Sequence, residues 1–291
     1  MRIKIKPIVL ALLFLGILIL INTGSVPVTS SKKNGVKIPI LLYHHIDNKV
    51  LNEVIITPEK FSADMNAIKK AGYESITFND LTLALNGYKE LPQKPIIITF
   101  DDGYYSNYKY AYPILKGIGM RAVINIIGWS AGRSSYINEN KEITPHFTWE
   151  EANEMINSGV IEIQNHTYDL HSNEGLSTGY GKICGMGVKP LKNEGYSDYK
   201  KRLTQDIIKN NRDIFNNTGA VSTFVAYPFG AYTNETEQVL TEIGIDGTLT
   251  TNEGVRYYSS TDDLKKMPRL TVTMEKKGGD LINAIDTLPI N

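Results

Sequence analysis

Two separate groups of acidic and imidazole side chains are the best candidates for chemistry in this sequence. Asp101 and Asp102 are adjacent and are followed by Gly103, while His166 and His171 stand five residues apart. One aspartate with two histidines forms a ligand set typical of open catalytic zinc or iron sites. Each group alone also fits a plainer role, as an Asp-Gly turn at a strand end or as surface or core histidines. Together they favour a catalytic metal site.

These side chains stand where predicted strands end. Residues 95–100 are short, apolar and rich in β-branched side chains, which predicts a buried strand that ends at the two aspartates. Gly103 allows the chain to bend there, so that both carboxylates can face one pocket. A strand over residues 160–167 carries His166 near its end. Because residues five apart on a helix are separated by about 140°, a turn must bring His171 beside it.

The rest of the chain alternates between predicted strands and helices. Because the repeated alternation implies a parallel sheet or barrel, the active site is expected at the carboxyl ends of the strands. Further strands are predicted over residues 38–46, 73–78, 121–129, 221–227, 247–251 and 270–274. Helices are predicted over residues 58–72, 80–86, 104–118, 149–157, 198–217, 234–243 and 279–285. Within residues 104–118, the helix is expected as far as the neighbourhood of Pro113.

Polar residues indicate where several of these helices begin. Thr57 before a proline and Thr148 with a glutamate three residues on are typical N-caps, and Asn79 and Asn234 are expected to cap two other helices. Residues 172–196 are rich in Gly, Lys and Ser and lack periodicity. A loop of that length inside a compact domain is usually functional, so we expect it to border the substrate groove and tune substrate choice.

Composition narrows the classes of function. The 291 residues carry 31 basic and 31 acidic side chains, so that nothing favours a polyanionic partner, and nucleic acid is not an expected ligand. The single cysteine, Cys184, excludes internal disulfides and cysteine-rich zinc sites. A metal must therefore be held by His, Asp or Glu. The five histidines are His44, His45, His146, His166 and His171.

The amino terminus has the layout of an export signal. Basic residues at positions 2, 4 and 6 precede an uncharged apolar run over residues 7–21 and a polar stretch over residues 22–34. The run is shorter than the roughly 20 residues that span a bilayer comfortably, which favours a signal peptide, although a membrane anchor stays open. We expect residues 1–35 to export a monomeric domain of residues 36–291, secreted or held at the outer face of the cell membrane, with membrane contact only through this segment.

Four short motifs resemble a known family. Residues 99–103 (Thr-Phe-Asp-Asp-Gly) and 166–171 (His-Thr-x-x-x-His) resemble the first two motifs of the polysaccharide deacetylases, carbohydrate esterase family four. Residues 227–230 (Tyr-Pro-Phe-Gly) resemble the third motif, and the Tyr-His at residues 43–44 also recurs in the family. The five-residue histidine spacing, together with Tyr199-x-x-Arg202-x-x-x-Asp206 after the loop, is similar to the branch that deacetylates poly-β-1,6-N-acetylglucosamine. The resemblance covers residues 38–285.

The resemblance implies a distorted (β/α) barrel that holds one divalent metal ion, expected to be zinc, through Asp102, His166 and His171. It also implies that Asp101 is the general base. This division of labour suits amide hydrolysis, since zinc activates water and polarises the carbonyl while the free aspartate takes the water proton. The backbone N–H of Phe229 is the implied second donor to the oxyanion. The expected substrate contacts come from Tyr104, Tyr227 and Phe229, with core aromatic roles open for the last two.

The sequence departs from the family pattern at two points. Ala226 stands where the third motif usually begins with an arginine that orients the base, and Arg269 is the candidate to supply that charge from a neighbouring strand. Many members carry a late histidine as general acid, but no histidine follows His171. His44 is the expected substitute, while the metal or Asp101 are alternative proton carriers and a strand-end structural role for His44 also stays open.

Three functions fit these residues. The leading hypothesis is a metal-dependent hydrolase that removes N-acetyl groups from N-acetylglucosamine in a surface or extracellular polysaccharide, either poly-β-1,6-N-acetylglucosamine or peptidoglycan. A metal-independent glycosidase using Asp101 and a distant carboxylate such as Glu162 is the second. The third is a catalytically weakened carbohydrate-binding protein on the same fold, which the two departures suggest.

Overall fold

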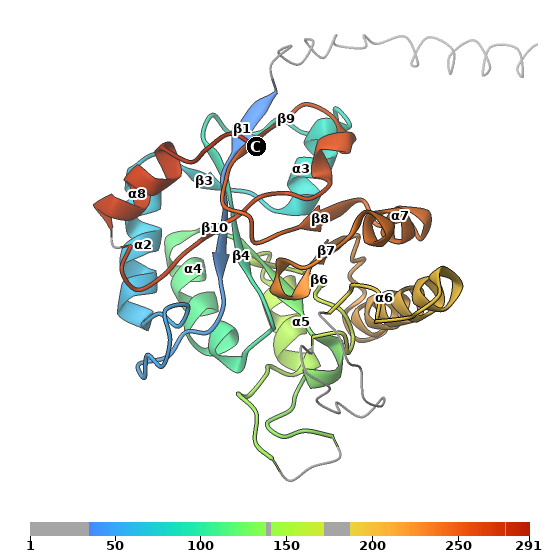
Figure 1. Cartoon of the computed structure of the whole chain (residues 1–291). Helices are drawn as coiled ribbons and strands as arrows, with labels where there is room; N and C mark the ends of the chain where they lie inside the picture. Colours follow the sequence, from blue (N-terminus) through green and yellow to red (C-terminus); the bar gives the residue numbers. More distant parts are fainter. Residues whose placement is uncertain (1–34, 138–140, 172–186, 277) are drawn as a thin grey trace, which may run out of the picture. The chain divides into compact units, whose positions relative to one another are not determined.

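The computed structural model describes residues 35–137, 141–171, 187–276 and 278–291. Its main element is a curled sheet of parallel strands in the order β10-β2-β4-β5-β6-β7-β8, with β3 beside β4 (Figure 1). A short antiparallel pair, β1 with β9, lies apart from it. The strands are β1 (Val36–Ile38), β2 (Ile40–Tyr43), β3 (Glu74–Ser75), β4 (Pro95–Phe100), β5 (Ala122–Ile126), β6 (Ile161–Asn165), β7 (Phe224–Ala226), β8 (Gly247–Leu249), β9 (Arg256–Tyr258) and β10 (Leu270–Thr271).

Helices follow most of these strands and form the crossovers that parallel pairing requires. The helices are α2 (Pro58–Lys70), α3 (Phe78–Leu85), α4 (Tyr112–Ile118), α5 (Trp149–Asn157), α6 (Tyr196–Thr218), α7 (Asn234–Glu242) and α8 (Gly279–Asp286). Shorter helical turns are η1 (Asn107–Ala111), η2 (Gly128–Ser130), η3 (Pro228–Gly230) and η4 (Thr261–Leu264).

One segment links the two edges of the curled sheet. Met267 forms a parallel bridge with Leu249 next to the β8 edge, and Leu270 pairs with Leu41 of β2 three residues later. The segment therefore nearly closes the sheet into a barrel, and Arg269 lies within it. The predicted distorted (β/α) barrel is confirmed as this curled parallel sheet.

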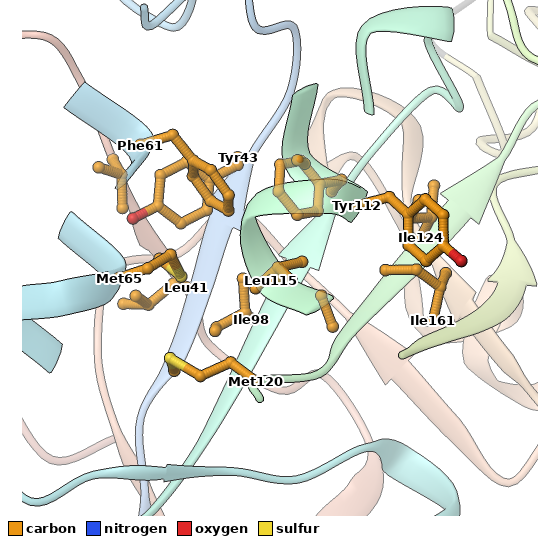
Figure 2. Packing of buried hydrophobic residues seen from close by; sticks show 14 of the residues in the cluster. Leu41, Tyr43, Phe61, Met65, Ile98, Tyr112, Leu115, Met120, Ile124 and Ile161 are labelled. Carbon is orange, nitrogen blue, oxygen red and sulfur yellow. The ribbon is translucent and has the colours of Figure 1, made fainter. Parts of the chain in front are cut away.

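Strands β2, β4, β5, β7 and β8 of the curled sheet are buried on both faces, as near-continuous apolar runs predict. Alternate residues point to opposite sides, so that in β4 Ile98 joins an outer cluster and Ile97 an inner one. In Figure 2 the outer cluster packs side chains of β2, β4 and β5 against α2 and α4. Phe61, Met65 and Ile68 form the buried face of α2, as their spacing predicts. At the inner face, the rings of Phe78 and Phe224 stack with centroids 4.5 Å apart.

Two predicted helix caps are wrong by one or two residues. The side chain of Thr77, not Asn79, accepts the capping hydrogen bond of α3, and that of Thr233, not Asn234, caps α7. In both cases the side chain three residues later, Asp80 or Thr236, accepts a hydrogen bond from the backbone N–H of the capping threonine. This reciprocal arrangement outweighs the simple preference for asparagine. The caps at Thr57 and Thr148 are confirmed.

Two other elements differ from the sequence prediction. The helix expected over residues 104–118 as far as the neighbourhood of Pro113 continues past that proline to Ile118, and its middle forms a π-helical turn, η1, directly before α4, which has Pro113 in its first turn. Proline is tolerated there because the first turn needs no N–H donor. Strand β9 was not predicted, since its three residues are too few to show a period.

The export prediction for residues 1–35 falls almost wholly outside the described residues. So does most of the loop prediction, since residues 172–186 are not described. Within the described ranges, no helix has the length and apolar character needed to cross a membrane.

Candidate metal centre and active site

A cavity of about 370 Å³ opens at the carboxyl ends of β2, β4, β6 and β7. Residues far apart in sequence meet there because parallel strands present their carboxyl ends at one edge of the sheet. The expected site residues that line the cavity are His44, Asp101, Asp102, Tyr104, His166, His171, Tyr227 and Phe229. Arg269 lies behind this lining and is fully buried.

The three predicted metal ligands form a compact group. The Nε2 atoms of His166 and His171 lie 3.4 Å and 3.3 Å from Oδ1 of Asp102. That oxygen is buried and has no hydrogen-bond partner, which is costly unless a cation satisfies it. Two imidazole nitrogens and one carboxylate oxygen suit a divalent ion such as zinc. Among the described residues, this is the one group whose ligand atoms are close enough to hold a metal ion.

The backbone turns at the metal group earlier than the sequence suggested. Asp102 itself has φ of +77°, in the left-handed region, and Gly103 follows with φ of +83°. A Cβ on Gly103 would lie 3.1 Å from Cγ2 of Ile126, so the glycine serves both the turn and the close approach to β5. The left-handed turn directs neighbouring carboxylates into one cavity.

His166 is oriented by a backbone carbonyl. Its Nδ1 lies 2.8 Å from the carbonyl oxygen of Ala226 at the end of β7, so Nδ1–H donates and Nε2 is left to face Asp102. This is the usual way in which a protein fixes the tautomer of a metal-binding histidine. Burial alone would lower the pKa of His166, but the Asp101 and Asp102 carboxylates raise it. Although Ala226 cannot supply a charge, its backbone carbonyl orients His166.

Arg269 supplies the charge that Ala226 cannot. Its two terminal nitrogens lie 2.8 Å and 2.7 Å from the two oxygens of Asp101, in a bidentate pair with no exposed surface on the arginine. Its Nε donates to the carbonyl of Thr250 at 2.8 Å. Burial would raise the pKa of Asp101, but Arg269, together with His166 and His44, holds that pKa well below its usual range. The base candidate is thus kept ionised.

Asn125 is a site residue that the sequence reasoning missed. Its side-chain amide donates to Oδ1 of Asp101 at 2.7 Å, and the residue is fully buried in β5. The available signal was an asparagine within the apolar run of residues 122–126, because a polar side chain in a buried strand needs a partner.

His44 occupies the cavity wall, as predicted. The side-chain amide of Asn107, the first residue of η1, donates to the backbone carbonyl of His44 at 2.9 Å. The hydroxyl of Ser106 accepts the N–H of Ile46 at 3.1 Å and lies 2.8 Å from Nδ1 of His45. The π-helical turn thereby fixes the end of β2, and π-helical turns are frequent at functional sites.

The imidazole of His146, which the prediction left without a role, packs against Tyr104 of this wall. The Tyr104 ring lies between His45 and His146, with centroid separations of 5.0 Å and 5.1 Å. Burial lowers the pKa of His146 to about 4. Burial and the neighbouring Asp102 raise the pKa of Tyr104. Both side chains are therefore neutral at pH 7.

The two aromatic residues of the third motif differ in what they offer a ligand. Phe229 is 41% exposed, adopts φ of +59°, and packs its ring 4.5 Å from that of His171. Tyr227 has no exposed side-chain surface, and its hydroxyl donates to Oε1 of Glu237 at 2.7 Å. Tyr227 lines the cavity but also stacks on Tyr232 in the core, so its contact with substrate stays a prediction.

Glu162 faces a different cavity from Asp101. A larger space of about 480 Å³ lies near the amino ends of β5 to β8, where Glu162, Arg121 and Asp246 line it. Glu162 accepts hydrogen bonds from the N–H of Asn79 and from the side chain of Gln164. A glycosidase needs both carboxylates on one scissile bond. The separation into two cavities removes the structural support for that hypothesis.

Comparison with known proteins agrees with the fold. The profile of the polysaccharide deacetylase family matches residues 88–248, which is more than half of the chain, and the chain belongs to this family. A solved structure of IcaB from Ammonifex degensii superposes with a TM-score of 0.69 at 22% identity, covering 87% of this chain and 99% of that one.

Two curated relatives extend the comparison. The Bacillus subtilis (strain 168) protein YxkH is 31% identical over 218 residues, which cover 75% of this chain and 66% of the relative. The poly-β-1,6-N-acetyl-D-glucosamine N-deacetylase of Escherichia coli (strain K12) is 24% identical over 242 residues, covering 75% of this chain and 36% of that enzyme. The chain thus spans less than two thirds of the length of either relative.

Proposed function

We propose that this protein is an exported, metal-dependent hydrolase that removes N-acetyl groups from N-acetylglucosamine residues of a surface polysaccharide. Poly-β-1,6-N-acetylglucosamine is the favoured polymer and peptidoglycan the alternative. The observation that carries the proposal is the ionised Asp101, clamped by Arg269, directly beside the Asp102, His166 and His171 group. The named activity of the Escherichia coli relative supports the choice of polymer.

Asp102, His166 and His171 would hold one divalent ion, with zinc as the ion that best suits the donors. Bound there, the ion would acidify a water molecule and polarise the acetyl carbonyl. His166 is held for this role by Ala226, while His171 is backed by the ring of Phe229.

Asp101 is the proposed general base. A carboxylate offers about four lone-pair positions, two on each oxygen. On Asp101, Oδ1 accepts from Asn125 and from one nitrogen of Arg269, and Oδ2 accepts from the other nitrogen of Arg269. One position on Oδ2 is left to accept the proton of the attacking water. The low pKa of this carboxyl keeps it ready to do so at neutral pH, although it makes Asp101 a weak base that depends on an acidified water.

Two further groups complete the proposed reaction. His44 in the cavity wall would protonate the leaving amine, and the backbone N–H of Phe229 would donate to the oxyanion. The exposed faces of Phe229 and Leu51, 41% and 71% exposed, flank the cavity mouth and offer apolar contact to a sugar ring. Arg269 is a positioning residue, because it acts through Asp101.

Acetate release from β-1,6- and β-1,4-linked N-acetylglucosamine oligomers tests the proposal. We expect release by the wild-type protein and its loss in Asp101→Asn. Glu162→Gln is the matched control, since it replaces a carboxylate by an amide in the other cavity and should retain activity. Loss of activity in Glu162→Gln with retention in Asp101→Asn would contradict the assignment. The preferred linkage identifies the polymer, and release from neither oligomer would direct the assay to peptidoglycan.

A further inference from the structure

The turn between the two histidine ligands is strained. Residues 166–171 leave β6 and fold back so that the rings of His166 and His171 lie with centroids 5.0 Å apart. Thr167 within this turn has φ of +70°, a left-handed conformation that is rare for a β-branched residue. Such a conformation persists only where the surrounding structure holds it in place. The identity of the element that holds this turn therefore bears directly on the ligand geometry.

Two elements hold this turn. In η2, the N–H groups of Gly128 and Trp129 donate to the carbonyls of Thr167 and Tyr168 at 3.0 Å and 3.1 Å. In α6, Asp206 makes the first side-chain contact. One carboxylate oxygen of Asp206 accepts the backbone N–H of Tyr168 at 2.7 Å, and the other accepts the N–H of Asp169 at 2.8 Å. A single side chain thus fixes two successive peptide groups between the two ligands. Only a carboxylate presents two acceptors in this arrangement, since an amide would turn an N–H donor toward one of these backbone donors.

Asn210, one helical turn further along α6, makes the second contact. Its fully buried side-chain nitrogen lies 2.9 Å from the carbonyl of Thr167, 3.0 Å from that of Ile126 and 3.0 Å from Oδ1 of Asn165. Gly128 makes this approach possible, because a Cβ there would collide with Oδ1 of Asn210. The amide joins the ends of β5 and β6 to the strained residue.

We propose that Asp206 and Asn210 are positioning residues that set the separation of the His166 and His171 rings and so determine the metal affinity of the site. This inference rests on the metal site of the proposed function. Neither side chain lines the cavity, and among the described hydrogen bonds neither bonds to a ligand imidazole; both act through the backbone of residues 167–169. Partners that orient metal ligands typically contribute 10- to 100-fold in affinity.

The test measures zinc affinity of the full chain by competition with a chromophoric chelator, together with the visible spectrum of the cobalt-loaded protein. For Asp206→Asn we expect affinity about 10- to 100-fold lower and an altered cobalt spectrum. Asp213→Asn is the matched control, because it makes the same exchange on α6, where Asp213 pairs only with Lys209 among the described contacts. It should bind zinc like the wild type.

Folding is checked separately by thermal unfolding in chelator. If Asp206→Asn does not fold, Asn210→Ser is measured against the same expectation. Zinc affinity within about twofold of wild type and an unchanged cobalt spectrum in a folded variant would overturn the positioning role. Failure of the wild-type protein itself to bind zinc or cobalt would instead overturn the metal site of the proposed function, so the two failures are distinguishable.

Discussion

Replacing Arg269 by methionine tests the buried ion pair at the centre of the site. The arginine has no exposed surface and donates to both oxygens of Asp101, to the hydroxyl of Thr99 and to the carbonyl of Thr250. Methionine retains much of the apolar stem but none of these donors. Removing one partner of a buried pair leaves the other charge unpaired, which costs about 3–5 kcal/mol. We expect Arg269→Met to lower the free energy of unfolding by that amount.

The second half of the test is a double-mutant cycle. Asp101→Asn removes the charge that Arg269 neutralises, so the double variant Asp101→Asn/Arg269→Met should be less destabilised than the sum of the single variants. The assay is urea unfolding followed by circular dichroism, with metal content held constant. Arg256→Met is the matched control, since Arg256 donates only to backbone carbonyls among the described contacts and should be additive with Asp101→Asn.

Additivity of Asp101→Asn and Arg269→Met within about 0.5 kcal/mol would refute the reasoning, because independent sites add within that margin.

The Arg269→Met variant should also show a change in its kinetics. Without Arg269, burial becomes the dominant influence and the pKa of Asp101 rises. The acid limb of the pH dependence of kcat/KM should therefore move to higher pH in Arg269→Met.

Three further variants test single contacts. Asn125→Ala removes one donor to Asp101 and should lower kcat about tenfold with little change in KM. Tyr227→Phe removes the hydrogen bond to Glu237 and should cost about 1 kcal/mol of stability while leaving KM unchanged, because the ring is buried. The pKa of His146 is about 4 in the folded protein, against 6.5 for a free imidazole. Burial of the neutral ring therefore contributes to the free energy of unfolding above pH 6.5, and this contribution is lost as the pH falls toward 4. Urea midpoints measured between these pH values should therefore vary less for His146→Gln; an equally steep loss would contradict the burial argument.

The sequence predicts the proximity of the candidate metal ligands well because their positions follow from topology. Asp102 and His166 stand at the ends of apolar runs, and parallel strands bring such ends to one edge. Arg269 was identified because the missing charge at Ala226 had to come from elsewhere, and the structure places the arginine on the segment that nearly closes the barrel. Their proximity was predictable, whereas their chemical roles stay proposals.

The supporting contacts could not be predicted in the same way. Asn210 reaches a carbonyl 84 residues away, and nothing in the local sequence of a polar, amphipathic helix distinguishes it from solvent-facing neighbours. The turn was predicted at Gly103, because glycine is the residue expected in a left-handed conformation. The left-handed conformation of Asp102 was missed because it is imposed by the fold. Such contacts depend on tertiary packing, which periodicity does not encode.

Metal reconstitution of acetate release tests the central claim most directly. The full chain is stripped with chelator, dialysed and assayed on β-1,6-linked N-acetylglucosamine oligomers before and after addition of zinc. We predict no release from the stripped protein, recovery on addition of zinc, and no recovery in Asp102→Asn, whose side chain presents one of the three ligand atoms. Undiminished release by the stripped protein, or full recovery in Asp102→Asn, would contradict a metal-dependent deacetylase built on this site.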